Sequence, residues 1–353
     1  MYPAPPHIQL FPHAKPSIRN GNIELLRFLL MIGICVWHTF VHGFGYAKIA
    51  YGEDIQIPFA RLFIMCLMVP AVDSFMYISG YYGIRFTISK LIHFWILGVT
   101  TVIGCSYFFQ VQHPVAYIFP MSSGVWWFMK CYLLIMVVSP IIEKGLENLR
   151  LATQIKILLL LLLMNSVIKM LNFQSGGSDF VSLLIIYFIG RFVRLNCIVL
   201  RTSTSLLLWT ASTFLLFVLA LYFNIIGNRI NIWLLLGYNN PLVILQSIAI
   251  VSFFLSFKPI YNTFFLYLGH NCLSVYLITE LLGVTFMYKW WGSLFESSLL
   301  VYWVVILLTS LLCIAYSILV NFFTSFVMNK AKNPLGRLEK CIHGVLRNIL
   351  SEE

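Results

Sequence analysis

Four ionisable residues on one apolar stretch near the start of the chain could do chemistry together. They are Glu24, Arg27, His38 and His42. If the stretch is helical, the eleven positions from Arg27 to His38 amount to three turns with about 20° left over, so both side chains lie on one face. They are also about 16 Å apart along the axis, too far for a direct hydrogen bond. The spacing predicts two functional levels on a single helix.

Each of these residues also has a purely structural interpretation. Arg27 could lie near a helix end, reach the membrane surface with its charged group, and pair with Glu24, three positions earlier. His38 could be a buried histidine bonded to a neighbouring helix. His38 and His42, four positions apart, could be two metal ligands, but no third ligand is evident beside them, so we expect no metal site.

The composition indicates the environment of these residues. Of the 353 residues, 60% are hydrophobic and only 10% are charged, and the mean hydropathy is +0.89. A soluble protein keeps roughly a quarter of its residues charged, so this surface is covered mainly by membrane lipid. The net charge of +11 then indicates basic cytoplasmic loops and no nucleic-acid partner. The eight cysteines include no C-x-x-C pair, which indicates neither a disulfide framework nor a thiolate metal site.

Ten stretches are apolar enough and long enough to cross a membrane. A spanning helix needs about 20 mostly apolar residues, because the hydrocarbon core is about 30 Å thick. The stretches are 23–44, 58–79, 90–109, 126–143, 156–172, 180–199, 204–224, 232–257, 263–287 and 299–328. Their short connections predict an all-α integral membrane protein, a single bundle of about ten transmembrane helices.

The spans divide the chain into three segments. Residues 1–22 are Pro-rich and polar, without the apolar region of a signal peptide, and are predicted to be a cytoplasmic N-terminal segment. Residues 23–328 are the membrane domain, and 329–353 are a basic cytoplasmic tail. Sixteen Lys and Arg residues fall on the side of the N-terminus and five on the other side. Because basic residues collect on the cytoplasmic side, both termini are predicted to be cytoplasmic, in the plasma (inner) membrane.

The polar residues of the predicted spans fall at two depths. The inner layer consists of Arg27, Asp73 beside it, Arg85 and Lys90. The outer layer consists of His38, Lys130, Asn239, Asn240 and Glu280, and Trp126 and Trp127 are predicted to mark the outer interface. Ionisable residues in hydrocarbon are costly and usually mark a site, so the two layers indicate a substrate path across the membrane.

Several short motifs resemble those of a known family. The run IELLRFLLMIGICVWHTF, with its Arg-to-His spacing, resembles the opening of the membrane acyltransferase-3 family. Further similar pieces, in matching order and spacing, are Ser79-Gly80-Tyr81, Trp126-Trp127-Phe128-Met129, Leu268-Gly269-His270-Asn271 and Tyr276-Leu277-Ile278. Many members continue the last motif with His, where this chain has Thr279 and Glu280, so a second histidine of that kind is missing. The family's basic run after the second span is reduced here to Arg85 and Lys90, which could weaken donor binding.

The resemblance implies an O-acetyltransferase that moves an acyl group, usually acetyl, from cytoplasmic acyl-CoA to a hydroxyl of a surface polysaccharide or lipid-linked glycan. Acyl-CoA is then a substrate, and no tightly bound cofactor is expected. The candidate donor-binding residues are Arg27, Asp73, Arg85 and Lys90, since CoA carries phosphates. The candidate catalytic residues are His38, as general base or transient acyl carrier, and Glu280, as the group that holds the imidazole in its productive tautomer. The candidate acceptor-side residues are Lys130, Asn239 and Asn240.

Three other functions fit the same composition. A transporter or flippase for a glycan or lipid-linked intermediate would use the same path without acyl chemistry. An acyltransferase-like protein without activity could act as an assembly component. A glycan polymerase would normally have a long outside loop, and no loop of that kind is predicted here.

The charge distribution leads to a topology that can be measured. A reporter fused after Asn329 should read cytoplasmic, and a reporter inserted within 110–125 should read external. The reason is that the side of the membrane with sixteen basic residues is expected to be the cytoplasmic side. A C-terminal fusion that reads external would contradict the predicted topology.

Overall fold

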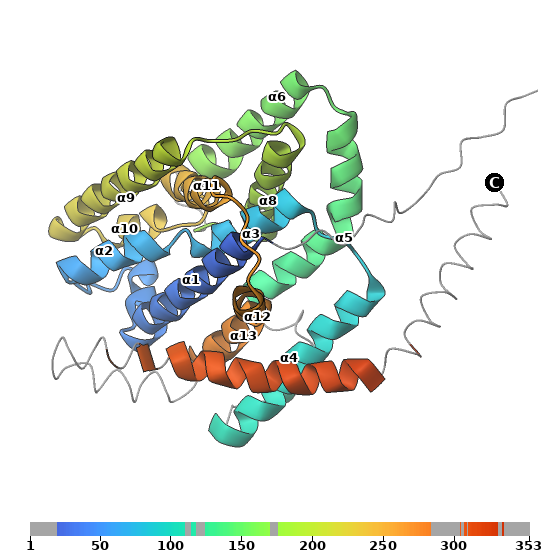
Figure 1. The fold of residues 1–353 in the computed structure, drawn as a ribbon. Helices are drawn as coiled ribbons and strands as arrows, with labels where there is room; N and C mark the ends of the chain where they lie inside the picture. The colour runs from blue at the N-terminus through green and yellow to red at the C-terminus, as the bar shows by residue number, and fades with distance from the viewer. Residues whose placement is uncertain are drawn as a thin grey trace, which may run out of the picture.

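The regular structure of this protein is helical. The computed structural model describes residues 20–109, 114–117, 124–169, 176–283, 304, 307–308, 310–330 and 334, and contains no strand within them (Figure 1). This confirms the predicted all-α class for the described residues. Most of the predicted N-terminal segment, the outside loop 110–125 and the C-terminal tail lies outside these residues.

The described residues form twelve labelled α-helices and a further helix near the C-terminus. They are α1 Gly21–His38, α2 Phe59–Met68, α3 Ala71–Tyr82, α4 Ile88–Phe109, α5 Trp127–Asn148, α6 Leu151–Leu162, α8 Phe180–Leu195, α9 Thr202–Ile225, α10 Arg229–Leu235, α11 Pro241–Leu255, α12 Thr263–His270, α13 Cys272–Gly283 and the helix Ser310–Lys330. A π-helical turn, Thr39–Gly43, continues α1 directly, and a second one, Leu163–Ile168, continues α6.

Six helices of the described part are long and apolar enough to cross a membrane. They are Gly21–Gly43, Phe59–Tyr82, Ile88–Tyr107, Leu151–Ile168, Thr202–Ile225 and Ser310–Lys330. Each overlaps a predicted span, so a multi-pass membrane protein is supported. The count of about ten spans stays a prediction.

Two predicted stretches, 232–257 and 263–287, are not single helices. In the first, α10 ends at Leu235 and α11 begins at Pro241, because Asn240 caps α11 through its side chain and Pro241 has no N–H to donate. In the second, α12 ends at His270, Asn271 follows as its C-cap, and α13 begins at Cys272. Both corrections concern segments that position the candidate site.

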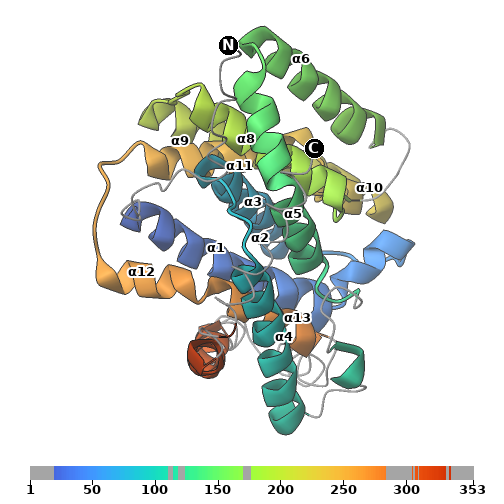
Figure 2. The same ribbon diagram turned by 90° about the vertical axis from the view of Figure 1, so that its right-hand side faces the viewer.

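The helix α1 lies inside the bundle. In Figures 1 and 2 it runs between a group containing α6, α8, α9 and α11 and a pair formed by α4 and Ser310–Lys330. The segments Gly21–Gly43 and Phe59–Tyr82 are each 72% buried, whereas the other four apolar segments are 22–28% buried. Lipid tails are as apolar as a protein core, so hydropathy alone does not separate inner from outer helices.

The break between α2 and α3 is stabilised by a buried glutamine. Pro70 has no N–H, so the carbonyl of Cys66, four residues earlier, lacks its helical donor. The side chain of Gln246 on α11 donates to that carbonyl at 3.2 Å. The carbonyl of Pro70 in turn accepts bonds from the hydroxyls of Ser74 and Ser247, at 2.7 and 3.1 Å. The kink is therefore fixed by polar contacts across helices.

Two glycines allow α3 and α8 to approach closely. A Cβ at Gly80 would overlap the carbonyl oxygen of Tyr187, and a Cβ at Gly190 would overlap the carbonyl oxygen of Tyr77. Small residues at such contacts are typical of membrane bundles, where close backbone packing replaces the hydrophobic drive between helices. The glycine of the Ser79-Gly80 motif thus has a packing role.

The same substitution at two helical glycines should have opposite effects. Gly80→Ala should lower the thermal unfolding temperature of the detergent-purified protein, since overpacking typically costs about 1–3 kcal/mol. Gly145→Ala on α5 is the matched control, because a Cβ there meets no atom within 4 Å and Ala favours a helix by up to about 1 kcal/mol. Equal unfolding temperatures for the two variants would contradict the close packing of α3 on α8.

Candidate active site

His38, the last residue of α1, lies at the centre of a polar cluster between α1 and α13. It is 7% exposed. Its Nε2 atom is 2.9 Å from Oε2 of Glu280, and its Nδ1 atom is 3.0 Å from Oγ1 of Thr279. His38 and Glu280, which were predicted to lie at a similar depth in the membrane, are therefore in direct contact.

The hydroxyl of Thr279 fixes the orientation of the imidazole. Its Oγ1 atom is within hydrogen-bond distance of the backbone carbonyls of Val275 and Tyr276, at 3.0 and 3.1 Å. It is also 3.0 Å from Nδ1 of His38, where the donor is set by the tautomer of the ring, and Nε2 faces Glu280. That Glu280 holds the imidazole in its productive tautomer stays a prediction, and the contact of Thr279 with the same ring was not predicted.

His42 is the third member of the cluster. The π-helical turn after α1 brings its ring to 5.5 Å from the ring of His38, between centroids. Its Nε2 atom is 3.6 Å from Oε2 of Glu280. Turns of this kind occur often at functional sites, because they change which side chains share a helix face.

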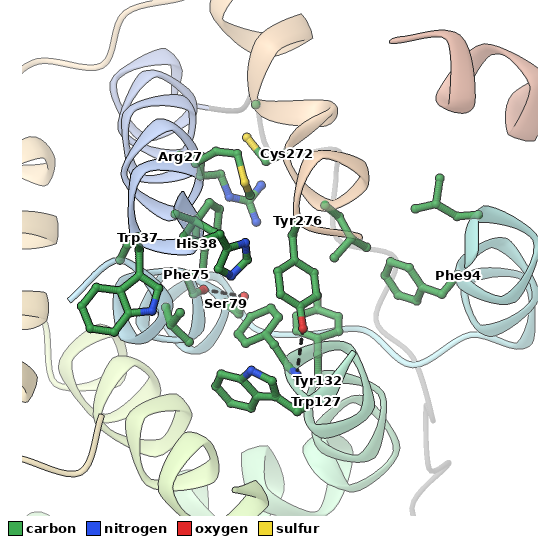
Figure 3. Close-up of a pocket in the computed structure, with 18 of the residues that line it drawn as sticks. Arg27, Trp37, His38, Phe75, Ser79, Phe94, Trp127, Tyr132, Cys272 and Tyr276 are labelled. Atoms are coloured by element: carbon green, nitrogen blue, oxygen red, sulfur yellow. Dashed lines mark hydrogen bonds between the residues drawn. The ribbon is translucent and has the colours of Figure 1, made fainter. Parts of the chain in front are cut away.

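Two hydrogen bonds hold α13 against the start of α5. The indole N–H of Trp126 donates to the carbonyl of Leu277 at 3.1 Å, and the backbone N–H of Phe128 donates to the hydroxyl of Tyr276 at 3.2 Å. Figure 3 shows the second bond as a dashed line. Trp126 is fully buried, and its depth at the outer interface stays a prediction. Its indole anchors the helix that carries Thr279 and Glu280.

The larger of two cavities at the cluster has a volume of about 340 Å³. Its lining is mostly apolar and aromatic, and includes Arg27, Ile34, His38, Phe75, Lys90 and Tyr276. Figure 3 shows Arg27 and His38 projecting from the same helix into this space. The prediction that Arg27 and His38 share a face is confirmed.

The smaller cavity, of about 160 Å³, is aromatic with a polar end. Its lining includes Trp37, Trp127, Trp233, Tyr238, His42 and Glu280. The rings of Trp127 and Tyr238 are stacked, with centroids 5.4 Å apart and planes inclined by 25°. Four residues line both cavities, namely Trp37, His38, Trp127 and Tyr238. His38 therefore lies where the two cavities meet.

The predicted donor-side residues are only partly brought together. Arg27 pairs with Glu24 at 3.6 Å, as its structural interpretation predicted, and it also lines the larger cavity. Its Nε atom has no hydrogen-bond partner among the described residues. Lys90 lines the same cavity, and its Nζ atom donates to the carbonyl of Arg85 at 2.9 Å. The side chain of Arg85 is exposed and lines neither cavity.

Asp73 forms no ion pair with Arg27 among the described residues. It is fully buried, lines neither cavity, and has no hydrogen-bond partner for its carboxylate among the described residues. Val72, Phe75 and Ser79 form the cavity face of α3. Asp73 is rotated by about 100° from Val72 around the helix, so it faces other neighbours.

The predicted acceptor-side residues are not part of the lining of either cavity. Lys130, Asn239 and Asn240 line neither cavity. The side chain of Asn239 donates to the carbonyl of Asn165, and that of Asn240 donates to the carbonyl of Leu235, at 3.1 and 2.8 Å. They hold the loop between α10 and α11, which presents Tyr238 to both cavities. The aromatic residues themselves carried no distinguishing signal in so aromatic a sequence.

The fold and the cluster together define a multi-pass helical membrane protein with an ionisable site in its interior. Residues 20–320 match the family model described as "Acyltransferase domain". Because the match covers most of the chain, this protein belongs to that acyltransferase-3 family and is a membrane acyltransferase. Searches of curated proteins and of solved structures return no match.

Thr279 is a positioning residue whose hydroxyl can be tested separately from its shape. Thr279→Val is nearly isosteric but loses the hydrogen bond with Nδ1 of His38, so the rate of acyl transfer should fall about tenfold, the effect of one hydrogen bond. Thr279→Ser keeps the hydroxyl and should restore most of the rate. Both variants should unfold at similar temperatures. Equal rates of acyl transfer for the Val and Ser variants would show that the hydroxyl of residue 279 has no role in the site.

Proposed function

We propose that the protein transfers an acyl group, acetyl in the first instance, from cytoplasmic acyl-CoA to a hydroxyl of a cell-surface or lipid-linked glycan. The observation that carries this proposal is the position of His38 at the junction of two cavities of different chemistry. An enzyme that joins two substrates needs two binding spaces that meet at its catalytic group. In this proposal, the protein lies in the plasma membrane with both termini in the cytoplasm.

The larger cavity suits the acyl-bearing arm of CoA. Its apolar walls fit a flexible chain, and Arg27 and Lys90 bring positive charge to it. The free Nε–H of Arg27 and its guanidinium fork match phosphate or carbonyl oxygens of the donor. Arg85, exposed next to Lys90, would contact the phosphates outside the cavity.

The smaller cavity suits a sugar. The rings of Trp127, Tyr238 and Trp233 offer flat surfaces for the apolar face of a pyranose, and their N–H and O–H groups bond to hydroxyls. His42 and Glu280 supply polar contacts at the end nearest His38. Ligand sites of this kind combine apolar walls with a few placed polar groups.

The His38–Glu280 pair provides the proton acceptor. In its proton-free form, Nε2 takes the proton of the acceptor hydroxyl while the hydroxyl oxygen attacks the thioester carbonyl. The ester C–O bond forms, the thioester C–S bond breaks, and the CoA thiolate leaves and takes the proton from the imidazolium. The carboxylate of Glu280, 2.9 Å from Nε2, stabilises that imidazolium. Thr279 keeps the ring in position throughout.

Substitution of His38 tests the chemistry. His38→Gln keeps a hydrogen-bonding side chain but cannot accept a proton, so the rate of acyl transfer should fall on the order of 10² to 10⁴. The measurement is release of free CoA by purified protein with acetyl-CoA and acceptor glycan, with glycan acylation in cells as a second readout. Near-normal transfer by His38→Gln, or no CoA release by the wild type while glycan still crosses the membrane, would favour the transporter.

Substitution of Arg27 tests the donor cavity. Arg27→Lys keeps the charge but loses the fork and the Nε–H group, so the KM for acyl-CoA should rise with a smaller change in kcat. The comparison variant is Arg229→Lys, whose guanidinium is bonded to Asp54 away from both cavities. If Arg27→Lys fails to fold, the pairing with Glu24 is its main role. If it folds and leaves KM unchanged, Arg27 does not bind the donor.

A further inference from the structure

The cluster at the cavity junction also has the composition of a transition-metal site. His38, His42 and Glu280 each offer one donor atom, and these three atoms lie within 4.8 Å of one another. The sequence shows the two histidines, but only the fold adds the carboxylate, from a helix more than 230 positions further along the chain. Two imidazoles and one carboxylate form a donor set that binds Zn²⁺ in proteins.

Two of the three distances between the donor atoms are close to those around a bound Zn²⁺ ion. Ligand atoms bonded to tetrahedral Zn²⁺ at about 2.0–2.1 Å are about 3.3 Å from one another. Here Oε2 of Glu280 is 2.9 Å from Nε2 of His38 and 3.6 Å from Nε2 of His42. The two histidine nitrogens lie within 4.8 Å of each other, so binding of an ion would draw the two imidazoles together.

The surroundings also fit. A metal-binding histidine usually donates its other ring N–H to a fixed acceptor, and Nδ1 of His38 has that acceptor in Thr279. All three residues line the smaller cavity, which leaves room for a water or substrate oxygen as the fourth ligand. His42, by contrast, has no part in the proton transfer proposed above.

We infer that His38, His42 and Glu280 bind one Zn²⁺ ion from the smaller cavity, and that this ion inhibits acyl transfer. The ion occupies the lone pair of His38 Nε2 that would otherwise accept the proton of the acceptor hydroxyl. It also fills the end of the cavity where that hydroxyl would lie. Binding of the metal is independent of the proposed function, whereas the inhibition rests on it.

The direct test is equilibrium dialysis of the full chain, without a polyhistidine tag, against Zn²⁺ alone after chelator treatment. The wild type should bind one ion per chain at saturable affinity. His42→Ala and Glu280→Gln should each weaken Zn²⁺ binding by at least about tenfold. Loss of a residue that only hydrogen-bonds to a metal ligand already weakens metal binding by that factor. His93→Ala is the matched control, because His93 lines only the larger cavity and should leave binding unchanged.

Measurements of acyl transfer distinguish the failure of the metal site from the failure of the proposed function. Wild-type acyl transfer should fall in Zn²⁺ and recover with chelator, and whatever activity His42→Ala retains should be insensitive to the ion. His42→Gln replaces His42→Ala if the alanine variant does not fold. An active enzyme that shows no saturable Zn²⁺ binding, or binding that survives both ligand substitutions, overturns the metal site and leaves the proposed function intact. A different result would support the metal site and overturn the proposed function. In that case one Zn²⁺ binds per chain, both substitutions weaken this binding, and the metal-free wild type shows no acyl transfer.

Discussion

The contact between the end of α1 and α13 is the constraint on which the arrangement of this site depends. An ionisable group within an apolar bundle is costly unless it has a partner. Both ring nitrogens of His38 contact side-chain oxygens of consecutive residues of α13, at 3.0 and 2.9 Å, and His42 approaches the same carboxylate. Neither helix can rotate or slide without separating these groups. The side-chain contacts of Trp126 and Tyr276 then tie α13 to α5, so three helices are fixed around one imidazole.

Interruptions of helices shape the space around that contact. The break between α10 and α11 places Tyr238 between the two cavities, and the backbone N–H of Tyr238 donates to the carbonyl of Gly176 at 2.6 Å. Irregular backbone within a membrane protein is tolerated where it is buried or lines a cavity, because its polar groups then find partners. Asn239 and Asn240, which are adjacent in this break, serve that purpose.

Rigid packing on the other side of the bundle supports the same geometry. The carbonyl exposed by Pro70 is satisfied by Gln246, and Gly80 and Gly190 let α3 and α8 meet at backbone distance. The α3 face opposite to this contact lines the larger cavity with Val72, Phe75 and Ser79. One helix thus has a packing face and a cavity face, and the Ser79-Gly80 pair contributes one residue to each.

The sequence by itself determined the class, the family resemblance and the position of groups along and around single helices. Composition identified a membrane protein, and helical periodicity correctly placed Arg27 and His38 on one face. Depth counted from helix ends put Glu280 near His38. These properties depend on local geometry, in which each residue advances by a fixed rise and rotation.

Only the tertiary structure decided which side chains meet. His38 and Thr279 are 241 positions apart, and nothing in the period of either helix says that they face each other. Asp73, Lys130, Asn239 and Asn240 were at plausible depths but line neither cavity, because depth does not fix which neighbour a side chain faces. Hydropathy could not help, since lipid and protein interior are equally apolar. The partners of the polar groups were settled by helix packing, which brings residues together irrespective of their distance in the chain.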